Sequence, residues 1–337
     1  MKKLISLLLV LTFVFTCFVG CTKSGDVIND NTNTNEENNE TPKVAELTRV
    51  MSLKGPTGMG MAKLMTDGDE KYSFSLTSMP DDVTSAIISK TVDIAAVPTN
   101  LASVLYNKTE GEVKVIALNT LGVLYVLNTD NSINSIEDLK GKTIGATGQA
   151  STPEYILRYV LSENGIDPDK DVTINYYTDH AELATHMING TVSIGMLPEP
   201  QVSTVLMKNK DAQKVINLTE EWDKISPDSA LVQGCLVVRT EFAEKYPDSV
   251  ETFLEEYKAS VEYANTSENA ADTISAIGIV PSAAIAKLAI PGCNITFIDS
   301  ETGMKEKLSG FLNVLYTANP KSVGGALPLD DFYYENK

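Results

Sequence analysis

The sequence is poor in basic residues, in histidine and in cysteine, and each shortage narrows the range of functions. Its 337 residues include 27 lysines and arginines against 45 aspartates and glutamates, which gives a formal net charge of −18. Proteins that bind nucleic acid need a basic surface that neutralises phosphates, so we expect no nucleic-acid partner. Two histidines and four cysteines provide few ligands for a structural zinc. We therefore expect no metal and no cofactor.

Motifs of phosphate binding and of covalent catalysis are missing as well. Residues 55–63 have the sequence GPTGMGMAK, which lacks the Gly-Lys-Ser/Thr ending of a phosphate loop, and no G-x-S-x-G nucleophile motif occurs. His180 and His186 are six residues apart, which does not place two ligands on one helix face, and we interpret them as solvated helix residues. We expect no catalytic residue, and an extracellular enzyme remains the alternative.

The first 20 residues have the composition of a secretory signal peptide. Lys2 and Lys3 precede the apolar run LISLLLVLTFVFTCFVG, which is too short to span a membrane comfortably. The following Cys21 ends a Phe-Val-Gly-Cys sequence that resembles a bacterial lipobox, although Phe18 replaces the usual leucine. Cys21 is therefore the predicted lipid anchor, and an ordinary residue after a plain signal peptide is the alternative.

Residues 21–43 contain almost no large apolar side chains and are predicted to form a disordered tether. Two acyl chains anchor a protein stably without help from basic residues, which this acidic chain lacks. The sequence thus predicts an exported protein, anchored by lipid on the outer face of the bacterial cell membrane.

The body of the chain contains an internal repeat with a period near one hundred residues. Hydrophobic residues make up 43% of the sequence and charged residues 21%, as in globular proteins with room for two lobes. The repeated segments are TVDIAAVP at 91–98 and TVSIGMLP at 191–198, YSFSLTS at 72–78 and VTINYYT at 172–178, and KVI at 114–116 and 214–216. In each copy, strand-like apolar runs alternate with helical patterns, which predicts a parallel sheet covered by helices on both faces. The fold class is therefore α/β with two Rossmann-like lobes.

Two β-type runs, at 121–128 and 231–239, follow the first and second copies. We expect the chain to cross between the lobes through both runs, which would form a two-strand hinge. Lobe 1 is then residues 44–126 with 236–337, and lobe 2 is residues 127–235. Such lobes leave a cleft between them, which the ligand loops at the carboxyl ends of their parallel strands would face.

The C-terminal region lies outside the repeat and is predicted to be mostly helical and to pack onto lobe 1. Its residues Val250, Phe253, Leu254, Tyr257 and Val261 follow helical spacing and form a single apolar stripe. The two cysteines of the body, Cys235 and Cys293, could form a disulfide after export or remain as two buried free thiols, and the sequence leaves both outcomes open.

The loops expected at the cleft combine glycine, proline, threonine, serine and asparagine directly before helical segments. These loops are residues 55–60, 98–100, 119–120, 147–152 and 198–200. Unpaired backbone N–H groups at helix starts favour anionic or electron-rich ligand groups. Any one loop alone is better explained as a helix cap than as a ligand contact, but the occurrence of these loops at matching places in both copies favours a binding site.

Five stretches resemble the extracellular solute-binding subunits of ABC importers: LKGPTGMGMAKLM, VDIAAVPTNLASVLYNK, LKGKTIGATGQASTPEYIL, VSIGMLPEPQVSTVL and CLVVRTEF. They are most similar to the branch that binds nitrate, alkanesulfonates, taurine and thiamine-pyrimidine precursors. The resemblance implies a two-lobed type II periplasmic-binding-protein fold. A monomer of this type closes on a small solute and delivers it to permease and ATPase subunits.

Carried over by position, the resemblance implies a set of ligand-binding residues. They are Pro56, Thr57, Gly58, Met59, Pro98, Thr99, Asn100, Thr120, Thr147, Gly148, Gln149, Ser151, Thr152 and Glu199.

The identity of the solute is less constrained. The predicted loops have no lysine or arginine at their centres, whereas Glu199 could accept a hydrogen bond from an amino group. This combination favours a neutral or amino-bearing heterocycle over a strong anion. Glu199 as a carboxylate that only stabilises a helix start is the alternative, and a sensory lipoprotein with the same cleft is an alternative to transport.

Overall fold

The computed structural model describes residues 44–68 and 70–335. The predicted signal peptide, the Cys21 anchor and the tether all lie outside these residues. Within the described part of the chain, no helix is long and apolar enough to cross a membrane.

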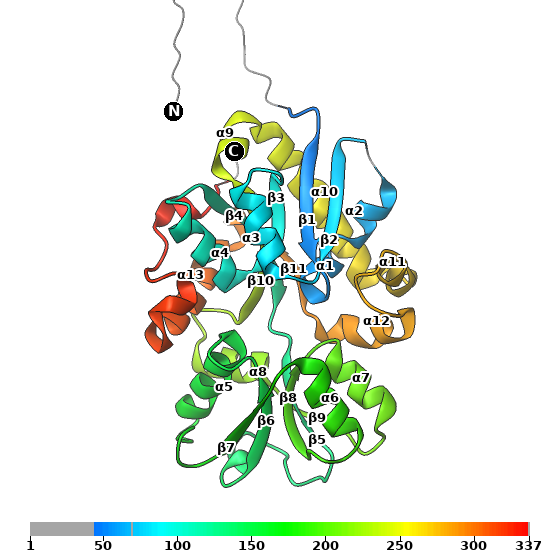
Figure 1. Cartoon of the computed structure of the whole chain (residues 1–337), viewed down its shortest axis with the longest axis vertical. Coiled ribbons are helices and arrows are strands. Elements are labelled where there is room, and N and C mark those ends of the chain that lie inside the picture. The colour runs from blue at the N-terminus through cyan, green and yellow to red at the C-terminus, as the bar shows by residue number, and fades with distance from the viewer. Residues whose placement is uncertain (1–43, 69, 336–337) are drawn as a thin grey trace, which may run out of the picture. The chain divides into compact units, whose positions relative to one another are not determined.

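The described strands form two mixed sheets, one in each half of the body (Figure 1). The first sheet has the order β11-β4-β10-β3-β1-β2, with β1 Thr48–Leu53, β2 Tyr72–Thr77, β3 Ile94–Pro98, β4 Val113–Leu121, β10 Val232–Arg239 and β11 Ile295–Ile298. The second sheet has the order β7-β6-β8-β5-β9, with β5 Leu124–Asn128, β6 Thr143–Thr147, β7 Thr173–Tyr177, β8 Ile194–Pro198 and β9 Gln213–Asn217. We call the first sheet with its covering helices the first half, and the second sheet with its covering helices the second half.

Helices cover both sheets, as the alternating pattern predicts. Those of the first half are α1 Pro56–Met59, α2 Ala62–Asp67, α3 Pro80–Ile88, α4 Thr99–Lys108, α9 Thr240–Lys245, α10 Pro247–Thr266, α11 Ala270–Ala276, α12 Ala283–Ala289 and α13 Met304–Ala318. Those of the second half are α5 Thr152–Glu163, α6 His180–Ile188, α7 Gln201–Lys208 and α8 Leu218–Ile225. Short 3-10 turns are η1 Glu137–Leu139, η2 Ile290–Gly292, η3 Ser300–Thr302, η4 Pro320–Val323 and η5 Asp330–Phe332.

The internal repeat corresponds to matching positions in the two sheets. Strands β2 and β3 occupy the same places in the first sheet as β7 and β8 in the second. The predicted parallel pairing holds for β1, β2 and β3 and for β6, β7 and β8, but both sheets also contain antiparallel pairs and are therefore mixed. β10 lies between β3 and β4, and β5 lies between β8 and β9, each antiparallel to both neighbours. The chain enters each of these two strands directly after leaving the opposite half, so each runs against its two neighbours.

The expected hinge of two paired strands differs from the structure. β5 pairs with strands of the second sheet and β10 with strands of the first, so the two are not partners. The chain crosses between the sheets at residues 122–123 and 226–231 instead, which we call the crossing segments. The predicted boundaries at 126 and 235 therefore cut through β5 and β10, because each apolar run looks continuous in the sequence.

Gly122 allows the two crossing segments to approach closely. A Cβ atom at this position would overlap Thr219 Oγ1 of α8 and would lie 2.9 Å from Leu231 Cδ2 of the second crossing segment. Any larger residue would push the two segments apart.

The C-terminal region is mostly helical, as predicted, and it contacts both halves. The stripe from Val250 to Val261 on α10 is buried and packs against α2 and β11. α13 contacts α4, β4 and β10 but also α5 of the second half, and Phe311 packs against Trp222 of α8 with ring centroids 5.5 Å apart. The expectation that this region packs only on the first half is therefore incomplete.

The two body cysteines are free thiols. Cys235 on β10 and Cys293 after η2 are both buried and unpaired with each other. Burial raises the pKa of both thiols well above the usual value. Of the two outcomes that the sequence leaves open, the structure has the pair of buried thiols.

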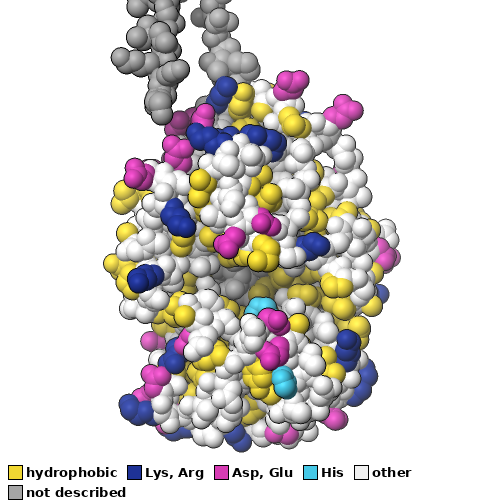
Figure 2. All heavy atoms as spheres, viewed as in Figure 1, with side chains coloured by type: hydrophobic (Ala, Val, Ile, Leu, Met, Phe, Trp, Pro, Cys, Tyr) yellow, Lys and Arg dark blue, Asp and Glu magenta, His cyan; other side chains and the backbone are white. Residues whose placement is uncertain are grey.

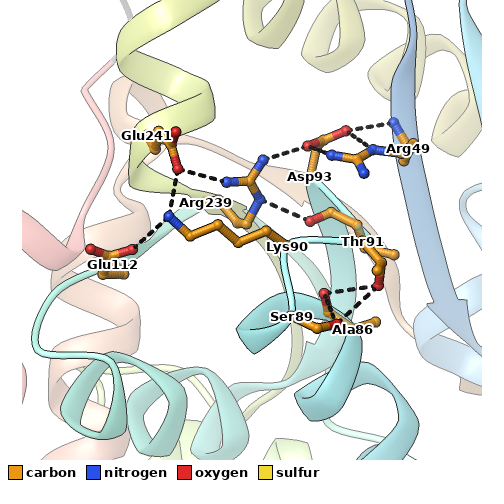
Figure 3. A network of polar contacts seen from close by, with 10 residues as sticks. Arg49, Ala86, Ser89, Lys90, Thr91, Asp93, Glu112, Arg239 and Glu241 are labelled. Carbon is orange, nitrogen blue, oxygen red and sulfur yellow. Dashed lines mark hydrogen bonds and ion pairs between the residues drawn. The ribbon is translucent and has the colours of Figure 1, made fainter. Parts of the chain in front are cut away.

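A network of charged side chains holds together the end of the first sheet where β1 and β3 begin (Figure 3). The Asp93 carboxylate, whose side chain is 2% exposed, accepts hydrogen bonds from Arg49 at the start of β1 and Arg239 at the end of β10, each at 2.7 Å. Arg239 also contacts Glu241, which pairs with Lys90 at 2.7 Å. One buried carboxylate thus joins three strands.

The described residues of the second half form no such network, because serine and threonine replace the aspartate and the β10 arginine. Ser193 is the counterpart of Asp93 in the repeat, and Thr129 N donates to its carbonyl at 2.9 Å just as Arg239 N donates to Asp93 O at 2.9 Å. The backbone pairing is the same in both halves, and only the side-chain charges differ.

We expect Asp93→Asn to destabilise the protein by about 3 kcal/mol, because it leaves two arginines beside a buried position without their carboxylate. Burial alone would raise the pKa of Asp93, but the hydrogen bonds from Arg49 and Arg239 outweigh it and lower that pKa below its usual value. The stability from this carboxylate is therefore present above the unfolded-state pKa of about 4 and is lost as the pH falls through the lower folded-state pKa.

Thermal unfolding of both proteins between pH 3 and pH 8 measures this effect. The gap between wild type and Asp93→Asn should be largest near neutral pH and should close in acid. The control is Glu112→Gln, whose carboxylate lies 3.7 Å from Lys90 at the exposed end of the network and should matter by less than about 1 kcal/mol. A gap that stays constant with pH would contradict a role for the charge.

Candidate functional site

A cavity of about 680 Å³ lies between the two halves, and Figure 2 shows the hollow on the molecular surface. Its lining comes from loops at the ends of strands in both sheets. The lining residues are Lys54, Gly55, Pro56, Thr57, Ser78, Pro98, Thr120, Val123, His180, Pro198, Glu199, Pro200, Gln201, Gln233, Ser275, Gly278, Ile279, Val280 and Pro281.

The carboxyl ends of the parallel strands account for much of this lining. Lys54 follows β1, Ser78 follows β2, Pro98 ends β3 and Pro198 ends β8. This is the place where open α/β sheets bind ligands. The prediction of ligand loops from both lobes around a shared space agrees with the position of the cavity.

Five of the predicted site residues line the cavity: Pro56, Thr57, Pro98, Thr120 and Glu199. Asn119 joins two of them, because its Nδ2 donates to Thr57 O at 3.1 Å while its Oδ1 accepts from Thr120 Oγ1 at 3.0 Å. The first helix start and the end of β4 are therefore held together on the wall of the first half.

Four other predicted residues do not line the cavity and instead pack within the first half. Met59 is fully buried in the core, and a side chain at Gly58 would overlap Leu53 O. The Thr99 hydroxyl donates to Val232 O at 2.7 Å, and Asn100 Nδ2 donates to Ser322 O at 3.5 Å. The helical pattern identified these loops, but it could not tell which side of each helix start faces the cavity.

The segment from the end of β6 to the start of α5 lies outside the cavity lining. It contains the predicted residues Thr147, Gly148, Gln149, Ser151 and Thr152. Gln149 is exposed, and the Ser151 hydroxyl donates to Gly148 O at 2.6 Å. Thr147 Oγ1 lies 2.6 Å from His180 Nδ1, so this segment contacts the cavity through a histidine. Direct binding of a solute by these five residues stays a prediction.

His180 is a cavity residue, so its interpretation as a solvated helix residue is wrong. It is the first residue of α6, directly after the Asp179 cap, whose Oδ1 accepts from Glu182 N at 2.8 Å. Burial lowers the pKa of His180, which Asp179 only partly offsets, so the ring is neutral at neutral pH. Its position at the start of the helix that follows β7 was the available sequence signal. His186 lies on the exposed surface of the same helix, as expected.

Glu199 is a buried carboxylate in the cavity wall of the second half, and it is 2% exposed. Its Oε2 accepts a hydrogen bond from Ser203 N at 3.0 Å, so the interpretation as a helix-start carboxylate also holds. Burial raises the pKa of Glu199 above its usual value, although Ser203 and Lys214 pull it back in part. One oxygen thus supports α7, and the carboxylate lines the cavity at the same time.

Gln233 is a cavity residue that the sequence did not indicate. It is the extra residue of a β-bulge on β10, because Val232 pairs with Leu121 while Gly234 pairs with Thr120. Bulges often redirect a side chain at a functional site. Its Nε2 is buried and has no hydrogen-bond partner among the described residues. The wall formed by residues 275–281 was also missed, because the C-terminal region has no counterpart in the repeat.

The cavity is nearly neutral and does not resemble a metal centre. Lys54 and Glu199 are the charged side chains among the described lining residues, beside the neutral His180. No group of three or more histidine, cysteine, aspartate or glutamate side chains in the described part of the chain could hold a metal ion. The lining therefore offers hydrogen bonds and apolar proline, valine and isoleucine surfaces.

Residues 70–279 match the family described as "ABC transporter, phosphonate, periplasmic substrate-binding protein". The chain belongs to this family. Its cavity therefore lies in a substrate-binding component of ABC importers, with the type II periplasmic-binding-protein fold. The resemblance inferred from the five sequence stretches is confirmed at this level.

Solved structures and a curated protein are also similar to this family member. An ABC transporter protein from Parabacteroides distasonis is 24% identical, with a TM-score of 0.75, over 87% of this chain and 100% of that chain. The periplasmic aliphatic sulphonate binding protein SsuA from Escherichia coli is 16% identical, with a TM-score of 0.66, over 87% of this chain and 93% of that chain. At these identities the likeness shows the fold alone.

The Bacillus subtilis protein YtlA is 24% identical over 223 residues, which is 55% of this chain. The matched region spans 65% of the length of YtlA.

We expect Glu199→Gln to raise the melting temperature of the ligand-free protein at neutral pH, by about 2–4 °C if the gain is on the order of 1 kcal/mol. Because the folded-state pKa of Glu199 is raised, its favourable protonated form contributes stability below the unfolded-state pKa of about 4.3 and loses it as the pH rises through the folded-state pKa. The benefit of glutamine should therefore be small in acid and grow with pH.

Melting curves from pH 4 to pH 8 test this expectation. The matched control is Glu182→Gln, which alters an exposed carboxylate at the start of α6 that accepts from Thr178 N at 2.7 Å. This control should give no gain. A loss of stability for Glu199→Gln at neutral pH would show that the carboxylate is well compensated where it lies.

Proposed function

We propose that this chain is a lipid-anchored solute-binding subunit that captures a small organic solute outside the cell and delivers it to permease and ATPase subunits. The observation that carries the proposal is the cavity, because its lining is supplied by strand ends from both halves. A solute in this position contacts both halves at once, which is what a closing binding protein requires.

Capture in this proposal is a shift between an open and a closed arrangement of the halves. The crossing segments at 122–123 and 226–231 are the places where the backbone can bend. A solute that contacts both walls binds more tightly to the closed arrangement, and this difference in affinity shifts the population toward it. The permease then receives the loaded, closed form.

The chemistry of the lining favours a solute that carries a hydrogen-bond donor, such as an amino group. Glu199 offers an acceptor in a buried setting, where a hydrogen bond to a charged group contributes about 1.5–3 kcal/mol. Proline, valine and isoleucine side chains provide apolar surfaces for the remainder of the solute. A solute that is only a strong anion would meet a carboxylate and no arginine among the described lining residues.

The remainder of the solute has two candidate chemistries. A neutral heterocycle agrees with the nearly neutral lining. A phosphonate agrees with the description of the family, and Lys54 together with neutral N–H and O–H donors would then face its oxygens. Both alternatives place the amino group at Glu199 and differ only in the remainder of the solute. One experiment with amino-bearing compounds of each kind therefore separates them.

We expect the mature protein to bind the amino-bearing member of a matched pair at least tenfold more tightly than its partner. The pairs are 2-aminoethylphosphonate with ethylphosphonate, 4-aminopyrimidine with pyrimidine, and taurine with ethanesulfonate, measured by calorimetry and thermal shift. Glu199→Gln should remove most of the preference, whereas the control Glu182→Gln should keep it.

Equal affinity for both members of every pair would contradict the role of Glu199. Binding of nitrate or of the partners without an amino group would favour the anion-binding alternative. Chemical conversion of a bound solute would favour the extracellular enzyme.

We expect Cys21→Ser to release the protein from the membrane, because the two acyl chains that would anchor it can no longer be attached. Cell fractionation with detection of the protein in the medium measures the effect. The control is Cys235→Ser, which alters a buried thiol of the body. Membrane association of the Cys21→Ser protein that resists high salt would contradict lipid anchoring at this residue.

A further inference from the structure

A hydrogen bond joins the second half to the C-terminal region beside Glu199. Tyr125 lies on β5 and is 2% exposed, and its Oη donates to Gly292 O at 2.8 Å. Gly292 is the last residue of η2, which precedes β11 of the first sheet. We call this interaction the Tyr125–Gly292 contact.

The absence of a side chain at Gly292 leaves room for the Glu199 carboxylate. A Cβ atom at this position would lie 2.9 Å from Glu199 Oε1, 3.1 Å from its Cγ and 3.3 Å from Tyr125 Oη. These separations are shorter than ordinary van der Waals contacts, so even alanine would displace the carboxylate or the tyrosine. The backbone of Gly292 does not require glycine, because its φ is not in the left-handed region. Space alone accounts for the glycine.

The titratable groups around Glu199 come from both sides of the contact. Lys214 of β9 places its Nζ 4.1 Å from the centre of the Tyr125 ring. Lys214 lowers the pKa of Glu199, while burial and the nearby Glu199 raise the pKa of Tyr125 to about 12. The tyrosine hydroxyl is therefore protonated and able to donate at any physiological pH. The buried Cys293 thiol and Glu220 of α8 also raise the pKa of Tyr125.

The same C-terminal segment also holds the first crossing segment. Asn294 Nδ2 donates to Gly122 O at 2.5 Å, and Leu121 N donates to Asn294 O at 3.1 Å. Gly292 is thus two residues from an attachment that fixes where the chain leaves the first half. The first half therefore sets the position of Gly292 relative to the cavity, whereas Glu199, which Gly292 contacts, belongs to the second half.

We propose that Gly292 and Tyr125 are positioning residues for Glu199, which keep its carboxylate in the cavity wall when the two halves are in the arrangement seen here. Neither residue lines the cavity. Gly292, in a segment attached to the first half, packs against the side of the Glu199 carboxylate that faces away from the cavity. Separation of the halves breaks the Tyr125–Gly292 contact and frees the carboxylate. Selection of the solute and the position of the halves are coupled through this contact.

The inference rests on the proposed role of Glu199 for its effect on solute binding, but its structural part can be tested without a solute. Glu199→Gln is expected to raise the melting temperature at neutral pH because a buried carboxylate is removed. In a Gly292→Ala background the carboxylate is already displaced toward water, so the same substitution should give less than half of that gain. An undiminished gain would overturn the inference.

A second set of measurements, which we call the solute arm, uses the matched pair of amino-bearing and amino-free solutes that the wild type distinguishes best. Gly292→Ala should weaken binding of the amino-bearing member about tenfold and leave its partner within twofold. In a Glu199→Gln background Gly292→Ala should have no further effect, because the residue acts through the carboxylate. Equal weakening of both members, or a further loss in the Glu199→Gln background, would mean that Gly292 has only a structural role.

The matched control is Gly145→Ala. A Cβ at Gly145 would lie 2.8 Å from Leu183 Cδ1 in the second half, away from the cavity lining. This variant should lower the melting temperature but keep both the preference for the amino group and the gain from Glu199→Gln. This control distinguishes the general loss of stability from adding a Cβ at a crowded glycine from the specific displacement of Glu199.

Tyr125→Phe tests the other partner and keeps the aromatic ring beneath Lys214. It should weaken binding of the amino-bearing solute by about three- to tenfold, because a hydrogen bond between the halves is lost. It should also reduce the gain from Glu199→Gln. The control Tyr334→Phe removes a hydrogen bond of 2.9 Å to Glu251 within the first half and should change neither quantity. Unchanged affinity and unchanged gain in Tyr125→Phe would overturn the inference.

Failure of the solute arm alone has a different meaning. If the wild type binds no member of any pair while the stability measurements behave as expected, the proposed solute class is wrong and the positioning of Glu199 stands.

Discussion

Each sheet of this protein is completed by an antiparallel strand that the chain enters just after leaving the other half. β5 is an interior strand of the second sheet and β10 an interior strand of the first, so both sheets depend on the two crossing segments. The parallel strands of the two sheets are thereby fixed with their carboxyl ends around one cavity. Sheet pairing, rather than a dedicated linker, determines where the binding site can form.

Two buried carboxylates have opposite roles in this arrangement. Asp93 is paired with two arginines at the far end of the first sheet and joins three strands there. Among the described residues no cation pairs directly with Glu199, so burial raises the pKa of Glu199, whereas the arginine hydrogen bonds lower the pKa of Asp93 despite its burial. The first carboxylate supports the fold, whereas the second lies where a solute could supply the missing partner. The same chemical group thus supports the fold in one place and has the proposed binding role in another.

The C-terminal region turns two similar halves into an asymmetric binding protein. Its residues 275–281 form one wall of the cavity, α13 packs against helices of both halves, and Gly292 lies behind Glu199. None of these elements has a counterpart in the repeat. The repeated part of the chain provides the two sheets, and the unrepeated part makes the two sides of the cavity different.

The sequence by itself determined the α/β class, the duplicated order of strands and helices, the buried stripe of α10 and five residues of the cavity lining. These features follow from periodicity and from strand ends, which are properties of neighbours along the chain. The tertiary structure decided which sheet each crossing strand joins, that His180 and Gln233 line the cavity, and that the loop at 147–152 does not. It also placed Gly292 against Glu199, 93 positions away in the sequence. Such contacts depend on how separate elements pack, and no local pattern of residues encodes them.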